Sequence, residues 1–200
     1  MSLKSYRAIF LACSSVLILI AAFPTLALVV PFPSRRHPFS ELYVLGPNRM
    51  AEDYPFNIVV NNAYHIFVGF SNHMGSSSYY LVYVKFRNQT QSLPNATTSE
   101  PSQLQPLYEF RTFVVDGGTW EAPLTFSVLE ASSADDFMFV RRLSINDVAF
   151  PVNLSARWDS KYNGFYYQLF FELWLYNSEE RSFQFHNRFV GIWFNVTSQV

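Results

Sequence analysis

Four asparagines are each followed, two positions later, by a serine or threonine, the spacing in which the side-chain amide can accept an N-linked glycan. Each tripeptide alone is also typical of an ordinary polar loop or strand end. All four lie in the C-terminal part of the chain, and together they favour an exterior location for that part. The four acceptor patterns are Asn88-Gln89-Thr90, Asn95-Ala96-Thr97, Asn153-Leu154-Ser155 and Asn195-Val196-Thr197.

The residues that usually carry catalysis or bind metals form no recognisable constellation. The sequence has no zinc-site spacing, nucleophile elbow, phosphate loop or dinucleotide fingerprint. The acidic pairs Asp135-Asp136 and Glu179-Glu180 lie in connectors, where neighbouring side chains splay apart rather than flank a sugar. Asp116-Gly117-Gly118 indicates a turn rather than a calcium loop. The four histidines, which could otherwise bind zinc, are scattered along the chain: His37, His65, His73 and His186. We therefore expect no catalytic residue, cofactor or metal.

Four large aromatic residues are candidates for binding a sugar or a partner protein. Aromatic rings can stack on a ligand, although packing inside a sheet protein is their commoner use. Both uses remain open for this group, which comprises Trp120, Trp158, Tyr162 and Trp174.

Alternating apolar and polar residues predict the strands that must position these side chains. From Phe165 to Tyr176 the odd positions are apolar, whereas Gln168 and Glu172 lie on the opposite face. After a turn, the same reasoning directs Asn195 outward, where a glycan would have room. It also assigns an inward row to Phe183, Phe185, Val190, Ile192, Phe194 and Val196.

Similar alternation recurs before this region, separated by polar turns. Residues 88–106 are rich in Asn, Gln, Ser, Thr and Pro, which predicts a long exposed loop. Repeated strands joined by short turns predict an all-β fold, an antiparallel immunoglobulin-like β-sandwich. The expected strands surround residues 58–60, 66–70, 80–86, 110–114 and 124–128.

An apolar run from Ala8 to Val30 dominates the N-terminus. As a helix it would span roughly 34 Å, enough for the ~30 Å hydrocarbon core of a bilayer. The domain organisation is then a short basic N-terminus (1–7), a transmembrane signal-anchor (8–30), a linker (31–39) and an exterior β-sandwich (40–200). A cleaved signal peptide, cut after Ala27, is the alternative.

Charge and cysteine content narrow the classes of partner. Lys4 and Arg7 precede the apolar run. Residues 31–200 therefore contain the other 12 of the 14 basic residues and all 15 acidic ones, which gives this part a net charge of −3. No basic patch indicates nucleic acid. The single cysteine, Cys13, lies in the apolar run, so residues 31–200 can form no internal disulfide and depend on packing for stability.

Two sequence stretches carry a family resemblance. The segment 41–47 (ELYVLGP), continuing through 51–57 (AEDYPFN), is similar to the opening of an archaeal membrane-protein domain called domain of unknown function 1616. Residues 68–73 (VGFSNH) resemble its next strand and turn, and the similarity extends over residues 40–128. The resemblance implies an immunoglobulin-like exterior module, usually carried after several membrane helices, with no known catalytic residues. This chain departs from that pattern, because it has one candidate helix.

These observations predict a single-pass membrane protein whose exterior domain has a structural or binding role in the cell envelope. Its partners would be the membrane, through the N-terminal helix, and an envelope protein or glycan. An alternative is a secreted surface subunit that assembles through sheet edges after signal cleavage. A hydrolase of envelope glycans is a remote third reading.

Overall fold

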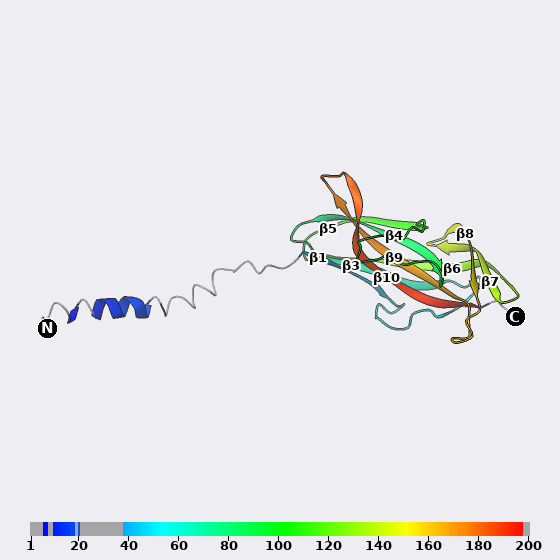
Figure 1. Cartoon of the computed structure of the whole chain (residues 1–200), viewed down its shortest axis with the longest axis horizontal. Helices are drawn as coiled ribbons and strands as arrows, with labels where there is room; N and C mark the ends of the chain where they lie inside the picture. Colours follow the sequence, from blue (N-terminus) through cyan, green and yellow to red (C-terminus); the bar gives the residue numbers. More distant parts are fainter. Residues whose placement is uncertain (1–5, 8–9, 19, 21–37, 198–200) are drawn as a thin grey trace. The chain divides into compact units, whose positions relative to one another are not determined.

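The computed structural model describes residues 6–7, 10–18, 20 and 38–197, and the chain divides into two units, Met1–His37 and Pro38–Val200 (Figure 1). The described residues of the first unit are helical. No helix among the described residues combines the length and the apolar character that a membrane crossing requires. Most of the predicted linker and part of the predicted anchor lie outside the described residues, so both stay predictions.

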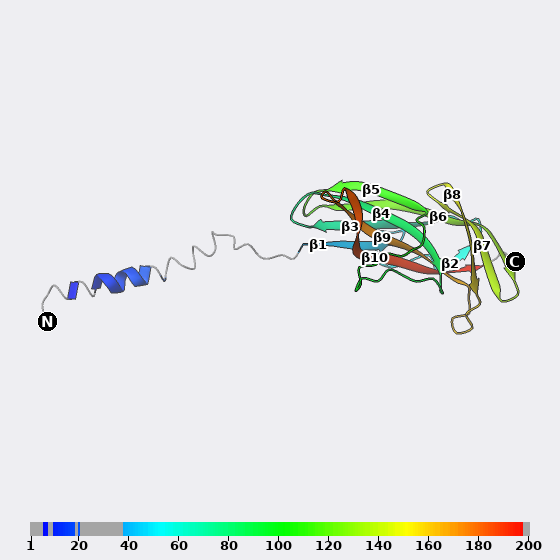
Figure 2. The same ribbon diagram turned by 45° about the horizontal axis from the view of Figure 1, so that its top comes forward.

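Residues 38–197 of the second unit form ten strands and their connections (Figures 1 and 2). Strands dominate because apolar and aromatic side chains alternate with polar ones through most of this region, the period at which one face of a strand is buried. The strands are β1 (Phe39–Leu45), β2 (Asn57–Val59), β3 (Tyr64–His73), β4 (Ser78–Asn88), β5 (Tyr108–Val114), β6 (Thr119–Ala134), β7 (Phe137–Ile145), β8 (Val148–Arg157), β9 (Tyr166–Asn177) and β10 (Ser182–Thr197).

Two five-stranded sheets pack face to face, which confirms the predicted sandwich. The first sheet has the order β1-β3-β6-β7-β8 and the second the order β2-β10-β9-β4-β5. The arrangement is immunoglobulin-like: β1, β3 and β6 take the places of strands A, B and E, and β4, β9 and β10 those of C, F and G. The hairpin β7–β8 widens the first sheet. One part of the prediction is wrong, because β2 pairs with β10 in parallel.

The core lies between the inner faces of the two sheets. Phe70 and Tyr80 meet there with ring centroids 4.6 Å apart, and Phe126 and Phe194 with centroids 5.4 Å apart. The hydroxyl of Tyr167 donates to the backbone oxygen of Met138, so this buried polar group is satisfied. Burial raises the pKa of Tyr167 above its ordinary value.

The outer face of β9 is also buried as far as Glu172, because the connection between β4 and β5 crosses it. The predicted exposure of residues 88–106 is therefore only partly correct, since Ser102 in this connection is buried. Its backbone N–H donates to Glu172 Oε1 (2.9 Å), and its carbonyl oxygen accepts from Lys85 Nζ (2.8 Å). Lys85 and Glu172 themselves form an ion pair at 2.9 Å, with side chains 3% and 0% exposed. This cluster fastens the connection to the sheet.

The predicted inward row on β10 holds for only part of the strand. Ile192, Phe194 and Val196 are buried in the core, as expected. Phe183 and Phe185 instead pair with the outward residues Tyr176 and Trp174 of β9. The register shift between Phe185 and Arg188 adds two residues to β10, so odd-numbered residues face outward on both sides of it. The predicted change from odd to even inward positions therefore does not occur.

Candidate functional site

An aromatic groove lies beside the second sheet, near the end of the sandwich where β10 finishes. Its volume is about 310 Å³, within the range of ligand pockets, about 300–1,000 Å³. The groove joins the segment before β2, the segment after β4, the β8–β9 loop, the start of β9 and the outer face of β10. Its lining residues are Phe56, Gln89, Asp159, Tyr162, Tyr166 and Trp193.

The β8–β9 loop is held in shape by its own polar groups. Asp159 and Gly164 exchange backbone hydrogen bonds of 2.9 and 3.3 Å, which close the loop at its base. Asp159 Oδ1 accepts from the backbone N–H groups of Lys161 (2.9 Å) and Tyr162 (3.2 Å), the pattern of an Asx turn. Figures 1 and 2 show this loop projecting from the sandwich before β9. The turn therefore positions the Tyr162 ring at the groove.

Trp193 is fixed from beneath by a buried cation. The guanidinium carbon of Arg87 lies 5.0 Å from the centroid of the Trp193 ring, within cation–π distance. Arg87 Nη1 donates to Gln168 Oε1 at 2.8 Å, and burial lowers the pKa of Arg87. This contact holds the indole while leaving it 38% exposed towards the groove.

The groove has a polar end beside its aromatic walls. Gln89 Nε2 donates to Asp159 Oδ2 over 3.4 Å, a long hydrogen bond, so both groups retain capacity for a ligand. Tyr166 packs against Tyr162, with ring centroids 6.3 Å apart, and against Phe56, at 5.9 Å. The arrangement can accept a flat apolar face on its rings and hydroxyl groups at Asp159 and Gln89.

The four predicted binding aromatics have separate positions. Tyr162 is in the groove, whereas Trp158 packs against Phe165, at 5.0 Å between ring centroids, and lines a different pocket. Trp174 is half-buried and donates to Glu172. Trp120 is partly buried and packs on Phe70 and Phe110, which favours the packing role for this residue.

Sequence reasoning missed five of the six groove residues: Phe56, Gln89, Asp159, Tyr166 and Trp193. The signal for Trp193 was present, because it lies between the inward residues Ile192 and Phe194 and must therefore face outward. Tyr166 carried the same signal, because it lies between the inward residues Phe165 and Tyr167. Phe56 had none, because it precedes the three-residue strand β2.

Of the four glycan acceptors, two have exposed side chains and two have side chains that are hydrogen-bonded within the domain. Asn95 and Asn153 are exposed. Asn88 Nδ2 donates to the Ser155 carbonyl at 2.7 Å. Asn195 lies on the outer face of β10, but its side chain is only 9% exposed and its Nδ2 donates to Asn57 Oδ1. The structure therefore contradicts the expected room for a glycan at Asn195.

Fold and groove together define a β-sandwich module with a ligand-sized aromatic recess. Residues 33–138 match the family model described as "Domain of unknown function (DUF1616)". This match covers more than half of the chain, so the chain belongs to that family, as the resemblance over residues 40–128 predicted. Four of the six groove residues lie after the matched region: Asp159, Tyr162, Tyr166 and Trp193.

Solved structures give weaker similarities. The CARDB domain of the PF1109 protein from Pyrococcus furiosus, in complex with di-metal ions, is 8% identical, covering 81% of this chain and 90% of that one, with a TM-score of 0.42. β-Glucosidase from Listeria innocua, in complexes with glucose and with gluconolactone, is 7% identical, covering 80% of this chain and 16% of that one, with a TM-score of 0.36. No curated protein matches this sequence.

Proposed function

We propose that this protein is a membrane-anchored module of the cell envelope whose exterior β-sandwich binds a pyranose-containing glycan. The observation that carries the proposal is the groove, which combines four aromatic rings with a carboxylate and an amide. No catalytic step is part of the proposed function.

The chemistry of a sugar ring matches this combination. A pyranose presents C–H groups on its faces, which pack on aromatic rings, and hydroxyl groups around its rim, which donate to carboxylate and amide oxygens. Trp193 and Tyr162 supply the rings, and Asp159 Oδ2 and the Gln89 amide supply the polar partners. A purely apolar ligand would cover the Asp159 carboxylate without adding a donor to the long hydrogen bond from Gln89, which disfavours that ligand.

Binding is favoured over hydrolysis because of the number of carboxylates. Most glycoside hydrolases place two carboxyl groups about 5–9.5 Å apart across the scissile bond. Among the residues that the structure describes around the groove, Asp159 is the one carboxylate.

Export is supported by two features of the chain. The apolar run from Ala8 to Val30 has the length of a membrane anchor. The acceptors Asn95 and Asn153 are exposed on the folded domain, as glycosylation would require. Intact mass and N-terminal sequencing of the membrane-fraction protein test this part: a start at residue 1 or 2 supports the anchor, whereas a start near Leu28 supports the secreted alternative.

Isothermal titration of the full-length protein in detergent tests the glycan proposal. The probes are cello-, chito- and manno-oligosaccharides, each incubated afterwards to detect cleavage products. We expect one of these classes to bind, and Trp193→Ala and Tyr162→Ala each to raise its Kd about tenfold or more through loss of ring contact. Trp158→Ala is the matched control, because Trp158 lies on the same loop but lines a different pocket.

Two outcomes would contradict the proposal. Binding that responds equally to Trp158→Ala and Trp193→Ala would place the sugar elsewhere. Absence of binding by all three oligosaccharide classes, with the circular dichroism of a folded sheet protein, would reject a glycan ligand in this groove. Cleavage products that disappear in Asp159→Asn would instead favour the hydrolase.

A further inference from the structure

The two sheets have four edge strands that could pair with a strand of another chain: β1, β8, β2 and β5. In three of them, such pairing is obstructed. On β1, the Ser40 carbonyl already accepts from Arg188 Nε at 3.0 Å. The edge strand β2 has three residues. On β8, Pro151 lacks a donor and Asn153 has a left-handed backbone (φ 45°), both of which interrupt a ladder.

The remaining edge, β5, is regular and open. Its seven residues pair with β4 in continuous register, and the strand contains no proline, glycine or bulge. In an edge strand, the outward backbone N–H and C=O groups are available to another chain. Phe113, at the end of β5, is 74% exposed, the largest exposed fraction among the large hydrophobic side chains described in residues 38–197. This edge combines free backbone groups with apolar surface.

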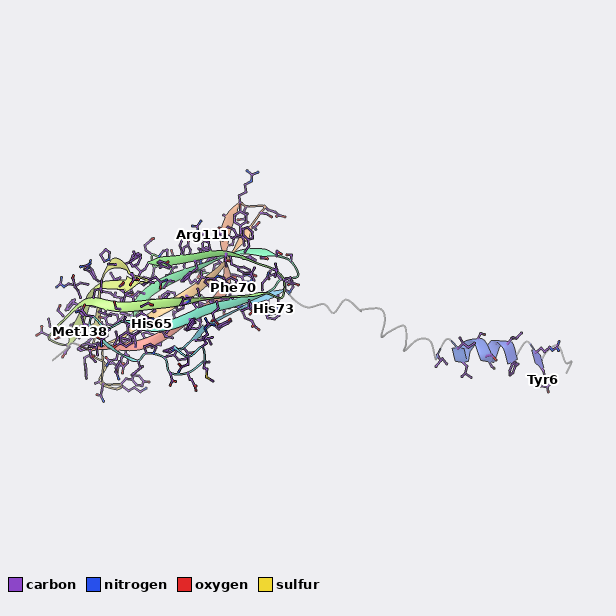
Figure 3. All side chains as sticks on the ribbon, turned by 180° about the vertical axis from the view of Figure 1, so that it is seen from behind. Tyr6, His65, Phe70, His73, Arg111 and Met138 are labelled. Carbon is purple, nitrogen blue, oxygen red and sulfur yellow. The ribbon has the colours of Figure 1, made fainter. Side chains whose placement is uncertain are left out.

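Two charges on β5 make the edge complementary to itself. Glu109 and Arg111 lie on the outer face of the second sheet, opposite Tyr83 and Leu81 of β4, and form an ion pair at 2.9 Å. Their side chains are 43% and 49% exposed. Figure 3 shows Arg111 on the side away from the core residue Phe70. In an antiparallel pair centred on Phe110, Glu109 of each copy would lie opposite Arg111 of the other.

We propose that β5 pairs with β5 of a second copy of this chain about a two-fold axis at Phe110. Main-chain hydrogen bonds join the two second sheets into one continuous sheet, and two Glu109–Arg111 cross-strand pairs fix the register. The interface is self-complementary, as a two-fold axis requires. Because the other three edges are obstructed, the contact closes at a dimer instead of propagating as a polymer.

This dimer leaves the aromatic groove free. Phe56 and Trp193 belong to the β2–β10 side of the second sheet, whereas β5 is its opposite edge. The proposal therefore does not depend on the proposed function, and a failure of one leaves the other standing.

Charge exchange between two variants tests the register. The full-length protein is studied by sedimentation equilibrium in density-matched detergent, with a reducing agent present because Cys13 could otherwise link two chains. Wild type is expected to dimerise. Glu109→Arg alone and Arg111→Glu alone each place like charges opposite one another twice, and should raise the dimer Kd about tenfold or more. A mixture of the two variants restores both opposite-charge pairs and should recover dimers.

Each result decides the proposal. Recovery in the mixture, and in the double variant Glu109→Arg/Arg111→Glu, supports the Phe110-centred pair. A monomeric wild type up to the highest soluble concentration overturns it. Dimers that persist unchanged in both single variants, or higher oligomers that grow with concentration, overturn it as well. Because both side chains are exposed, we expect the variants to fold, and circular dichroism checks this.

Discussion

Removal of the Lys85 charge should destabilise the domain strongly, because it leaves a carboxylate buried without its cation. In Lys85→Met, Glu172 would keep the backbone N–H of Ser102 (2.9 Å) and the indole N–H of Trp174 (3.1 Å) as partners. Its side chain is fully buried, so water cannot replace the ammonium group. Breaking a buried pair in this way costs about 3–5 kcal/mol.

The double variant Lys85→Met/Glu172→Gln separates charge from packing. The glutamine retains an oxygen that can accept from Ser102, and neither buried charge remains. We expect it to recover about 2 kcal/mol or more relative to Lys85→Met alone, since uncompensated charge is the larger cost. For a domain of this size, the single variant should lower the Tm by roughly 6–20 °C.

Urea denaturation followed by circular dichroism measures these free energies. Glu130→Gln is the matched control, because the Glu130–Arg142 pair has a similar distance, 2.8 Å, but side chains about half exposed. Such an exposed pair contributes about 0–1 kcal/mol. The reasoning is refuted if Lys85→Met costs no more than Glu130→Gln, or if the double variant is no more stable than Lys85→Met.

Three further predictions concern His186, the groove loop and the glycan acceptors. Burial, and then the nearby Arg188 charge, lower the pKa of His186; its neutral form is favoured in the folded state, so stability should be full above the unfolded pKa of about 6.5 and fall as pH decreases below it. Denaturation at pH 7.5 and 5 should show a smaller difference in His186→Gln. Gly164→Ala should destabilise the domain by about 1–3 kcal/mol in thermal unfolding, because an added Cβ would lie 2.6 Å from the Asn195 amide oxygen. In a host that N-glycosylates exported proteins, peptide mapping should find glycans at Asn95 and Asn153; equal occupancy at Asn88 and Asn195 would contradict the argument from their hydrogen bonds.

Local alternation predicted the strands well because it reports which side of a strand faces the core. The rows on β9 and at the end of β10 follow directly from it. The bulge after Phe185 was not predictable, since its two extra residues leave no mark in composition. Burial of both faces of β9 was equally hidden, because Glu172 resembles a solvent-facing residue until the distant segment around Ser102 is placed over it.

The candidate groove was only partly predictable for a related reason. Tyr162 stood out as an aromatic residue in a polar connector, and its exposure follows from that position. Phe56 reaches the groove through the parallel pairing of β2 with β10, a contact between residues about 138 positions apart. No local pattern encodes such a pairing, so the neighbours of Tyr162 required the three-dimensional structure.

The assembly of the groove from distant segments gives it a thermodynamic signature. Phe56, Gln89, Tyr162 and Trp193 are brought together by the folded sheet, so the unfolded chain has no comparable site. A ligand of this groove must then shift the unfolding equilibrium by mass action, by about 2.7 kcal/mol at a concentration one hundred times its Kd. Thermal denaturation in the presence of unlabelled compounds can therefore search for the natural ligand without any assay of activity.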